Sequence, residues 1–122
     1  MPQTEVILYK EGHTVPVREW LKSLPQKVAR KCLSYFVMLE QQGHELRRPI
    51  ADFLRDGIYE LRPSFQGVHY RILYFFSGRN VVVVSHGIVK KAEVPEMEID
   101  RAIQRRQSFE ADPETHSYRR SQ

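Results

Sequence analysis

The chain has 122 residues, of which 41% are hydrophobic and 28% charged, and its formal net charge is +4. This length allows one domain with a single core, and no run approaches the ~20 apolar residues of a membrane-spanning helix. The first residues have neither the basic nor the apolar segment of a signal peptide, which favours the cytoplasm. The single cysteine, Cys32, excludes an internal disulfide and a multi-cysteine zinc site. We therefore expect no membrane association, no metal and no cofactor.

The excess of positive charge suits a nucleic-acid partner only if the basic side chains face the polymer together. Residues 1–61 hold 9 Lys and Arg against 8 acids, and residues 62–122 hold 10 against 7. The sequence therefore does not separate a basic segment from an acidic one. Any basic surface must be assembled by folding.

One strand and one short helix are predicted at the start of the chain. Residues 5–10, EVILYK, have the composition of a strand, and the polar turn EGHT follows. Thr14 is placed to cap a helix, and Pro16 suits its first turn. The apolar positions of that helix have the spacing i, i+3, i+4 and i+7: Val17, Trp20, Leu21 and Leu24.

A second, longer helix is predicted after Pro25, which interrupts the first one. Gly43 ends it. Its apolar side chains form one stripe: Val28, Cys32, Tyr35, Phe36 and Leu39. Residues 44–56 then form a connection, and the pair Asp56 and Gly57 predicts a turn before the next strand.

The period of the apolar positions changes from 3.6 to 2 after Gly57. Residues 58–62, 68–76 and 80–88 predict three strands, separated by the turn compositions PSFQG and SGRN. An antiparallel meander is the simplest arrangement of these strands. The run VVVV in the last strand is apolar on both sides, which indicates a strand covered on both faces of the sheet.

A final helix is predicted after Pro95, with the acids Glu96 and Glu98 in its first turn. Residues 110–122 are polar and lack an apolar pattern, so we expect a flexible tail behind a single domain of residues 1–109. The predicted order is β-α-α-β-β-β-α. It corresponds to an α+β fold in which a small antiparallel-type sheet carries the two N-terminal helices on one face, together with a C-terminal helix.

Two arginines, Arg62 and Arg71, lie in predicted strands among residues that should be buried. Side chains alternate along a strand, and this alternation allows both arginines to share one face of the sheet. A buried guanidinium needs a partner, because an unpaired buried charge is very costly. Two interpretations stay open: an ion pair with a carboxylate, for which Glu60 and Glu93 are candidates, or a groove where the arginines meet an anionic ligand.

The segment SHGIVKKAEVP brings three further basic side chains to the end of the last predicted strand, just before the final helix: His86, Lys90 and Lys91. A lysine pair by itself is most often solvated. A lone histidine is more often held by a backbone carbonyl than catalytic. These residues therefore indicate a site only in combination with the two arginines.

Three blocks of the sequence resemble the signature blocks of RelE/HigB toxins, specifically their phage-derived HigB-like branch: DGIYELR, HYRILYFF and HGIVKKAEVPEMEIDRA. The resemblance covers roughly residues 5–106. It implies the compact RelE-like fold and the toxin of a type II toxin-antitoxin pair. Such a toxin is an endoribonuclease that cleaves mRNA, usually in the ribosomal A site. The implied partners are the ribosome, mRNA and a HigA-like antitoxin with a helix-turn-helix domain.

The resemblance also implies roles for the basic residues. Cleavage without a metal starts with attack of the 2′-hydroxyl on the adjacent phosphorus and needs positive charge at the phosphoryl oxygens. Arg62 and Arg71 are expected to hold the scissile phosphate. Lys90 and Lys91 are expected to bind the RNA backbone or to stabilise the transition state.

The proton carriers of the reaction stay open. Glu60 is a possible base, His86 is a possible acid or base, and a lysine with a lowered pKa is a third option. RelE-like proteins often complete the site with a residue near the C-terminal end of the fold. In this chain the role could fall to His116 or to Tyr118, or the tail could contribute no residue to the site.

Two alternatives to an RNA-cleaving toxin also stay open. One is a ParE-like toxin of the same fold, which binds and poisons DNA gyrase without cutting RNA. The other is an inactive phage remnant that folds but does no harm. A gyrase-binding protein has no need to gather the four cations of this sequence in one groove: Arg62, Arg71, Lys90 and Lys91.

Overall fold

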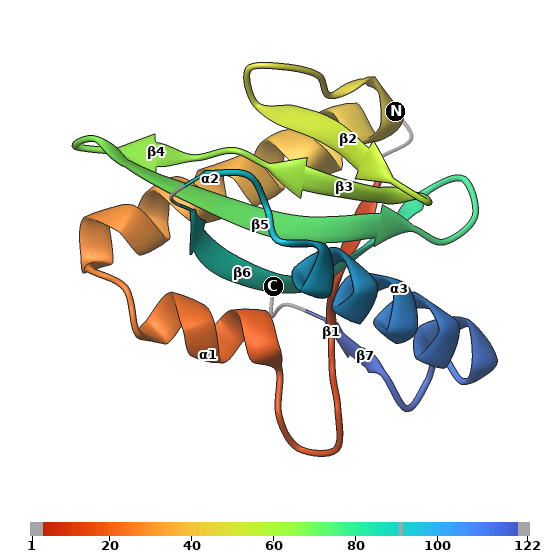
Figure 1. Ribbon diagram of the computed structural model, residues 1–122. Helices are drawn as coiled ribbons and strands as arrows, with labels where there is room; N and C mark the ends of the chain where they lie inside the picture. Colours follow the sequence, from red (N-terminus) through yellow and green to blue (C-terminus); the bar gives the residue numbers. More distant parts are fainter. Residues whose placement is uncertain (1–3, 91, 120–122) are drawn as a thin grey trace.

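The computed structural model describes residues 4–90 and 92–119 as one sheet with helices on both sides (Figure 1). The elements follow in the order β1 (Glu5–Tyr9), α1 (Pro16–Lys22), α2 (Gln26–Gln42), the 3-10 helix η1 (Gly43–Glu45), β2 (Ala51–Arg55), β3 (Ile58–Leu61), β4 (Ser64–Phe65), β5 (Val68–Phe76), β6 (Val81–Lys90), α3 (Glu96–Ala111) and β7 (Ser117–Arg119). The predicted α+β class is confirmed, and the three predicted helices correspond to α1, α2 and α3. Among the described helices, none has the length and apolar character needed to cross a membrane.

The sheet is mixed and follows the order β2-β3-β5-β6-β1-β7, with the short β4 paired to β5. β3, β5 and β6 form the predicted antiparallel meander. β1, however, runs parallel to β6, with Glu5 opposite Val81 and Leu8 opposite Val84. The expectation of an antiparallel-type sheet is therefore wrong for this pair. Most of the chain lies between the two strands, so either direction is possible, and the spacing of apolar residues does not indicate which one occurs.

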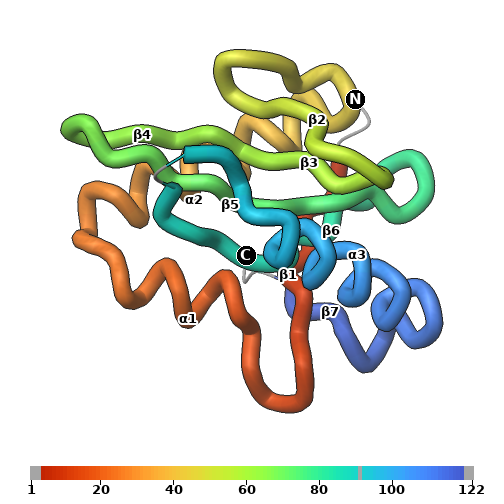
Figure 2. Tube along the Cα trace, viewed as in Figure 1, coloured from red at the N-terminus to blue at the C-terminus, as the bar shows by residue number. Residues whose placement is uncertain are grey.

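Two apolar layers cover the sheet, one on each face, and the trace of α3 passes in front of the strands while α2 lies behind them (Figure 2). The layer under α1 and α2 contains Val17, Val28, Cys32, Phe36, Leu39, Leu61, Ile72, Tyr74, Val82 and Val84. The layer under α3 contains Ile7, Ile58, Leu73, Phe75, Val83, Ile99, Ala102 and Phe109. The valines of β6 contribute to both layers, which confirms that this strand is covered on both faces.

Three of the described strands lie where the sequence predicts none: β2, β7 and the two-residue β4, which falls within the predicted turn PSFQG and pairs with β5. β2 falls within the predicted connection and pairs with β3 through a tight turn at Asp56 and Gly57, whose φ angles are 52° and 81°. β7 falls within the predicted tail, where it pairs with the edge of β1 and places Tyr118 opposite Leu8. Such short strands show too little alternation to be detected, and it is pairing with the main sheet that stabilises them.

The start of α1 also differs from the prediction. Val15 occupies the N-cap position, and Pro16 is the first helical residue. Thr14 instead forms a backbone bridge with Glu11, in which each residue's N–H donates to the other's carbonyl, at 2.8 and 3.0 Å. The tight turn between β1 and α1 uses Thr14 for this bridge, so the prediction of Thr14 as the cap is wrong.

Candidate functional site

Arg62, Arg71 and Glu60 converge on one face of the sheet. Arg62 directly follows β3, which pairs with β5, the strand that carries Arg71. Arg62 Nη1 donates to Glu60 Oε2 at 2.5 Å, and Arg71 Nε lies 3.4 Å from Glu60 Oε1. Strand alternation therefore brings the two arginines together, and Glu60 is the carboxylate between them.

One carboxylate serves two guanidinium groups in this cluster. Glu60 and Arg71 are each 3% exposed, and within the described part of the chain neither Glu60 Oε1 nor Arg71 Nε has a hydrogen-bond partner. Arg71 Nη1 donates to the carbonyl oxygen of Tyr70 at 2.8 Å. Burial lowers the pKa of Arg71, the charge of Arg62 lowers it further, and Glu60 opposes both effects. The cluster keeps an excess of positive charge.

Lys90 adds a third positive charge. It is the last residue of β6 and lies opposite His69 of β5. Burial lowers the pKa of its ammonium group, the charge of Arg71 lowers it further, and Glu60 acts in the opposite direction. Arg71 and Glu60 are therefore close enough to influence the charge of Lys90. Lys91, the other lysine named from the sequence, lies outside the described residues.

A pocket of about 270 Å³ opens at this cluster. Its charged lining comprises Arg48, Arg55, Arg62, Lys90, Asp52, Glu60, Glu93 and Glu96. Arg48 is paired with Asp52 at 2.8 Å, whereas Arg62 shares its carboxylate with the buried Arg71. The described lining therefore holds four cations and four acids, and the buried Arg71 adds a further positive charge behind Glu60 and Arg62. Among residues 4–90 and 92–119, no three His, Cys, Asp or Glu side chains are grouped as metal ligands.

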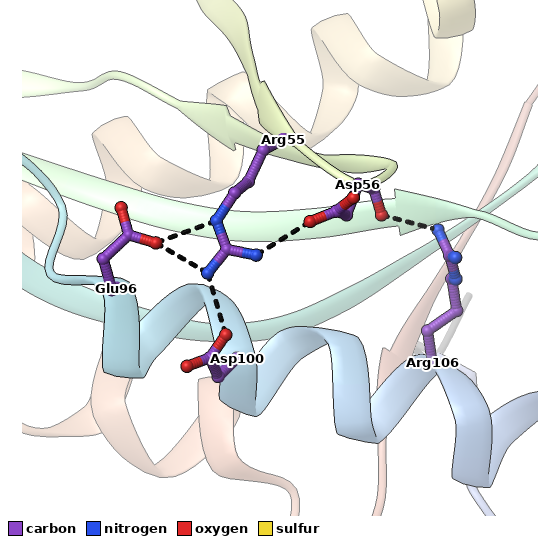
Figure 3. A network of polar contacts seen from close by, with 5 residues as sticks. All are labelled: Arg55, Asp56, Glu96, Asp100 and Arg106. Carbon is purple, nitrogen blue, oxygen red and sulfur yellow. Dashed lines mark hydrogen bonds and ion pairs between the residues drawn. The ribbon is translucent and has the colours of Figure 1, made fainter.

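Arg55 holds the first turns of α3 against the end of β2 (Figure 3). Its guanidinium contacts Asp56 at 2.8 Å, Glu96 at 2.7 Å and Asp100 at 2.8 Å. Hydrogen bonds to Asp100, Asp56 and Glu96 raise the pKa of Arg55 above its ordinary value. Further along α3, Arg106 Nη1 donates to the carbonyl oxygen of Asp56 at 3.1 Å. Because Arg55 and Glu96 both line the pocket, this network also sets one of its walls.

The region that contains these residues matches a known protein family. Residues 19–107 match the family described as phage derived protein Gp49-like (DUF891). The chain belongs to this family. No curated protein matches the sequence. The Gp49-like family is associated with RelE-like toxins of toxin-antitoxin systems, which supports the sequence resemblance at this coarser level.

His86 of this Gp49-like chain lies in a different network, between β6 and α3. Ser85 Oγ is 2.7 Å from His86 Nδ1, and His86 Nε2 is 2.9 Å from Glu98 Oε1. Burial lowers the pKa of His86 to about 4, and the charge of Arg105 contributes to this, although Glu98 opposes it. His86 is therefore a neutral imidazole near pH 7. Of the site residues predicted from the sequence that the structure describes, Glu60, Arg62 and Lys90 line the pocket, whereas Arg71 and His86 do not.

The two tail residues considered from the sequence lie at the opposite edge of the sheet. Tyr118 belongs to β7, which is separated from β3 by β5, β6 and β1. The guanidinium of Arg18 lies 5.2 Å from the centre of the Tyr118 ring. His116 stacks on Tyr9 with ring centroids 5.1 Å apart. Both residues make contacts far from Arg62.

Three charged residues of the pocket are absent from the sequence prediction: Arg48, Asp52 and Arg55. They lie in or next to β2, within the predicted connection. The turn at Asp56 and Gly57 is the signal that indicates them, because a tight hairpin turn requires a strand on each side. A strand before that turn places Asp52 opposite Glu60, as the structure has it.

Proposed function

We propose that this Gp49-like chain is the toxin of a type II toxin-antitoxin pair, of the HigB-like branch, and cleaves translated mRNA at the ribosome without a metal. The family's association with RelE-like toxins supports the class. The observation that carries the reaction is the pairing of Arg62 and Arg71 with the one carboxylate of Glu60, at a pocket that Lys90 also lines. A phosphodiester suits such a pocket, because guanidinium and ammonium groups bind its oxygens.

The reaction is an internal transfer at phosphorus. The ribose 2′ oxygen attacks the adjacent phosphorus and gives up its proton to solvent water, the P–O2′ bond forms, and the P–O5′ bond breaks. The leaving 5′ oxygen takes up a proton, so the products are a 2′,3′-cyclic phosphate and a 5′-hydroxyl. Negative charge develops on the phosphoryl oxygens during this step, and nearby positive groups stabilise it.

Arg62 is the side chain that we assign to the phosphoryl oxygens. It is 20% exposed and lines the pocket, so a bound phosphate can reach it. Arg71 is buried and contributes a fixed positive charge from beneath. Glu60 orients both guanidinium groups, and we assign it a positioning role. For Lys91, the family resemblance implies binding of the RNA backbone or stabilisation of the transition state.

Lys90 is the residue that we assign to proton transfer at the leaving oxygen. Its lowered pKa makes it a better proton donor near neutral pH than an ordinary lysine. His86 receives no role in the reaction, since Glu98 and Ser85 hold it in the separate network. A pocket with so few proton carriers suits a toxin that depends on the ribosome to orient its RNA.

A partner protein is part of this proposal, because a free toxin of this kind stops translation. We infer a HigA-like antitoxin with a helix-turn-helix domain, encoded next to the toxin gene. Sequencing the neighbouring region is the simplest check. A neighbourhood without a small reading frame of that type would contradict the pairing.

Replacing Arg62 tests the catalytic pocket. Induced expression of the unaltered chain without its partner should arrest growth. Arg62→Ala should relieve the arrest, because loss of one charge-stabilising donor lowers such rates by about 10²- to 10³-fold. Arg119→Ala is the matched control, since Arg119 pairs with Glu5 at 2.9 Å on the far edge of the sheet. The Arg119→Ala variant should remain toxic.

Primer extension on cellular mRNA after induction identifies the reaction. Cuts at codon positions support an mRNA endonuclease. Intact mRNA together with DNA damage would instead indicate the gyrase-poisoning alternative. An Arg62→Ala variant that is folded and fully toxic would contradict the role assigned to the pocket.

A further inference from the structure

A row of aromatic rings leads from the core to the exposed edge of the sheet. Tyr74 is 1% exposed and stacks with Tyr59 at a centroid distance of 5.4 Å. The ring of Tyr59 meets that of Phe53 edge to face, at 5.1 Å and 70°. His44 stacks on Phe76 in the same group of rings, at 3.6 Å. Phe53 is 52% exposed, so the row ends in a ring that faces solvent.

A hollow of about 300 Å³ lies beside the exposed ring. Phe53, Tyr59, His44, Arg47 and Asp52 contribute to its lining. Asp52 also lines the pocket that contains Arg62, and β2 is the outer strand of the sheet. Phe53 and Tyr59 lie on the face of the sheet under α2, whereas Glu60 and the Arg62 pocket lie on the face under α3. The two hollows are therefore joined only across the edge strand β2, where one offers an aromatic ring and the other offers cations.

The charges around this hollow favour an anionic polymer. Arg47 donates to the carbonyl oxygen of His44 at 2.8 Å, and among the described residues no acid pairs with it. Asp52 accepts bonds from Arg48 Nε at 2.9 Å and Nη2 at 2.8 Å. Burial raises the pKa of Asp52, but the bonds from Arg48 and the Phe53 backbone outweigh this, so the pKa is lowered. The hollow thus combines an aromatic face with a cation that no neighbouring acid neutralises.

We propose that Phe53 is a stacking platform for a nucleobase of an RNA strand that crosses the outer strand β2, with another part of the same RNA strand in the Arg62 pocket on the other face of the sheet. The inference rests on the proposed function. Every base has a π face, so bases stack on exposed aromatic rings with little sequence preference, while cations beside the ring hold the backbone. An apolar protein segment gains nothing from the uncompensated charge of Arg47. Single-stranded RNA is therefore the occupant that the charges favour.

Binding of a short single-stranded RNA to the purified chain tests the platform. The probe is a fluorescein-labelled oligonucleotide with 2′-O-methyl riboses, which cannot be cleaved, and the same backbone without bases is its comparison. Phe53→Ala should weaken binding of the RNA by about 5- to 150-fold and leave binding of the abasic chain unchanged. Phe53→Trp should retain affinity. Val37→Ala, which truncates another exposed apolar side chain, should change neither the binding of the RNA nor the binding of the abasic chain.

Several outcomes overturn the platform, and each is distinguishable from failure of the proposed function. If Phe53→Ala binds the RNA as tightly as the unaltered chain while Arg62→Ala binds it more weakly, Phe53 is not a platform. The role of the Arg62 pocket in RNA binding is then still supported. The platform is also overturned if all variants bind the RNA equally well, or if the unaltered chain does not bind it at low salt. In either case the growth assay with Arg62→Ala tests the proposed function separately. Loss of the antitoxin complex without loss of RNA affinity would assign Phe53 to a protein partner.

Discussion

Glu60 sets the electrostatic state of the candidate site. Its carboxylate is almost fully buried and lies between Arg62 and the equally buried Arg71. Burial of these groups costs desolvation energy, which their mutual attraction offsets. Without the carboxylate, two guanidinium groups remain close together, and one of them is out of reach of water. Removal of Glu60 should therefore cost far more than removal of an acid at the surface.

Glu60→Ala should lower the free energy of unfolding by about 3–5 kcal/mol, the range for breaking a buried ion pair. Glu5→Ala is the control, because it removes an exposed pair with Arg119 and should cost less than about 1 kcal/mol. Urea denaturation of both variants measures these losses. Equal losses would show that Arg71 does not depend on Glu60.

The contact between α1 and β6 requires a glycine. The ring of Trp20 lies over Gly87, where a methyl group would overlap the indole carbon atoms. The same ring meets the edge of Tyr70 at a centroid distance of 6.2 Å. Gly87 is paired with Ile72 inside the sheet, so the strand cannot simply move away. Close approach of helix and strand thus depends on the missing side chain.

Gly87→Ala should lower the free energy of unfolding by about 1–3 kcal/mol, the usual cost of overpacking. In a Trp20→Ala background the same substitution should cost less, because the overlapping ring is gone. Denaturation of the four variants gives the coupling energy of the pair. If Gly87→Ala costs as much without Trp20 as with it, the contact is not the cause.

Proton binding at His86 is linked to the stability of the whole domain. His86 joins β6 to α3 through Glu98, and α3 covers one of the two apolar layers. Burial and the charge of Arg105 keep the pKa of the folded imidazole near 4. The unfolded chain has an ordinary pKa near 6.5, so it takes up a proton first as pH falls. Acidification therefore favours unfolding in this window.

The free energy of unfolding should decrease as pH falls from about 6.5 to about 4. The contribution of His86 is fully present above this window and lost below it, with a slope of at most about 1.4 kcal/mol per pH unit. His86→Gln should flatten the slope. Urea denaturation at several pH values within the window measures it. The same slope in both proteins would contradict the assignment to His86.

Local periodicity predicts a large part of this molecule. The helical spacing of apolar residues locates α1 and α2, and strand alternation locates β3, β5 and β6. The same alternation places Arg62 and Arg71 on one face, because side-chain direction along a strand depends only on neighbouring backbone units. The amino-acid sequence by itself therefore determines the shared face of the two arginines and the position of Lys90 just ahead of the final helix.

Long-range pairing decides the rest. β2 becomes a strand because β3 is beside it, and this pairing brings Arg48 and Asp52 into the pocket and Phe53 to the hollow on the other face of the sheet. His86 and Lys90 are close in sequence, but an extended strand separates them by roughly 13 Å, and α3 covers His86 while Lys90 reaches the pocket. Such outcomes depend on which surfaces of distant segments meet after folding, and periodicity within one segment carries no information about that.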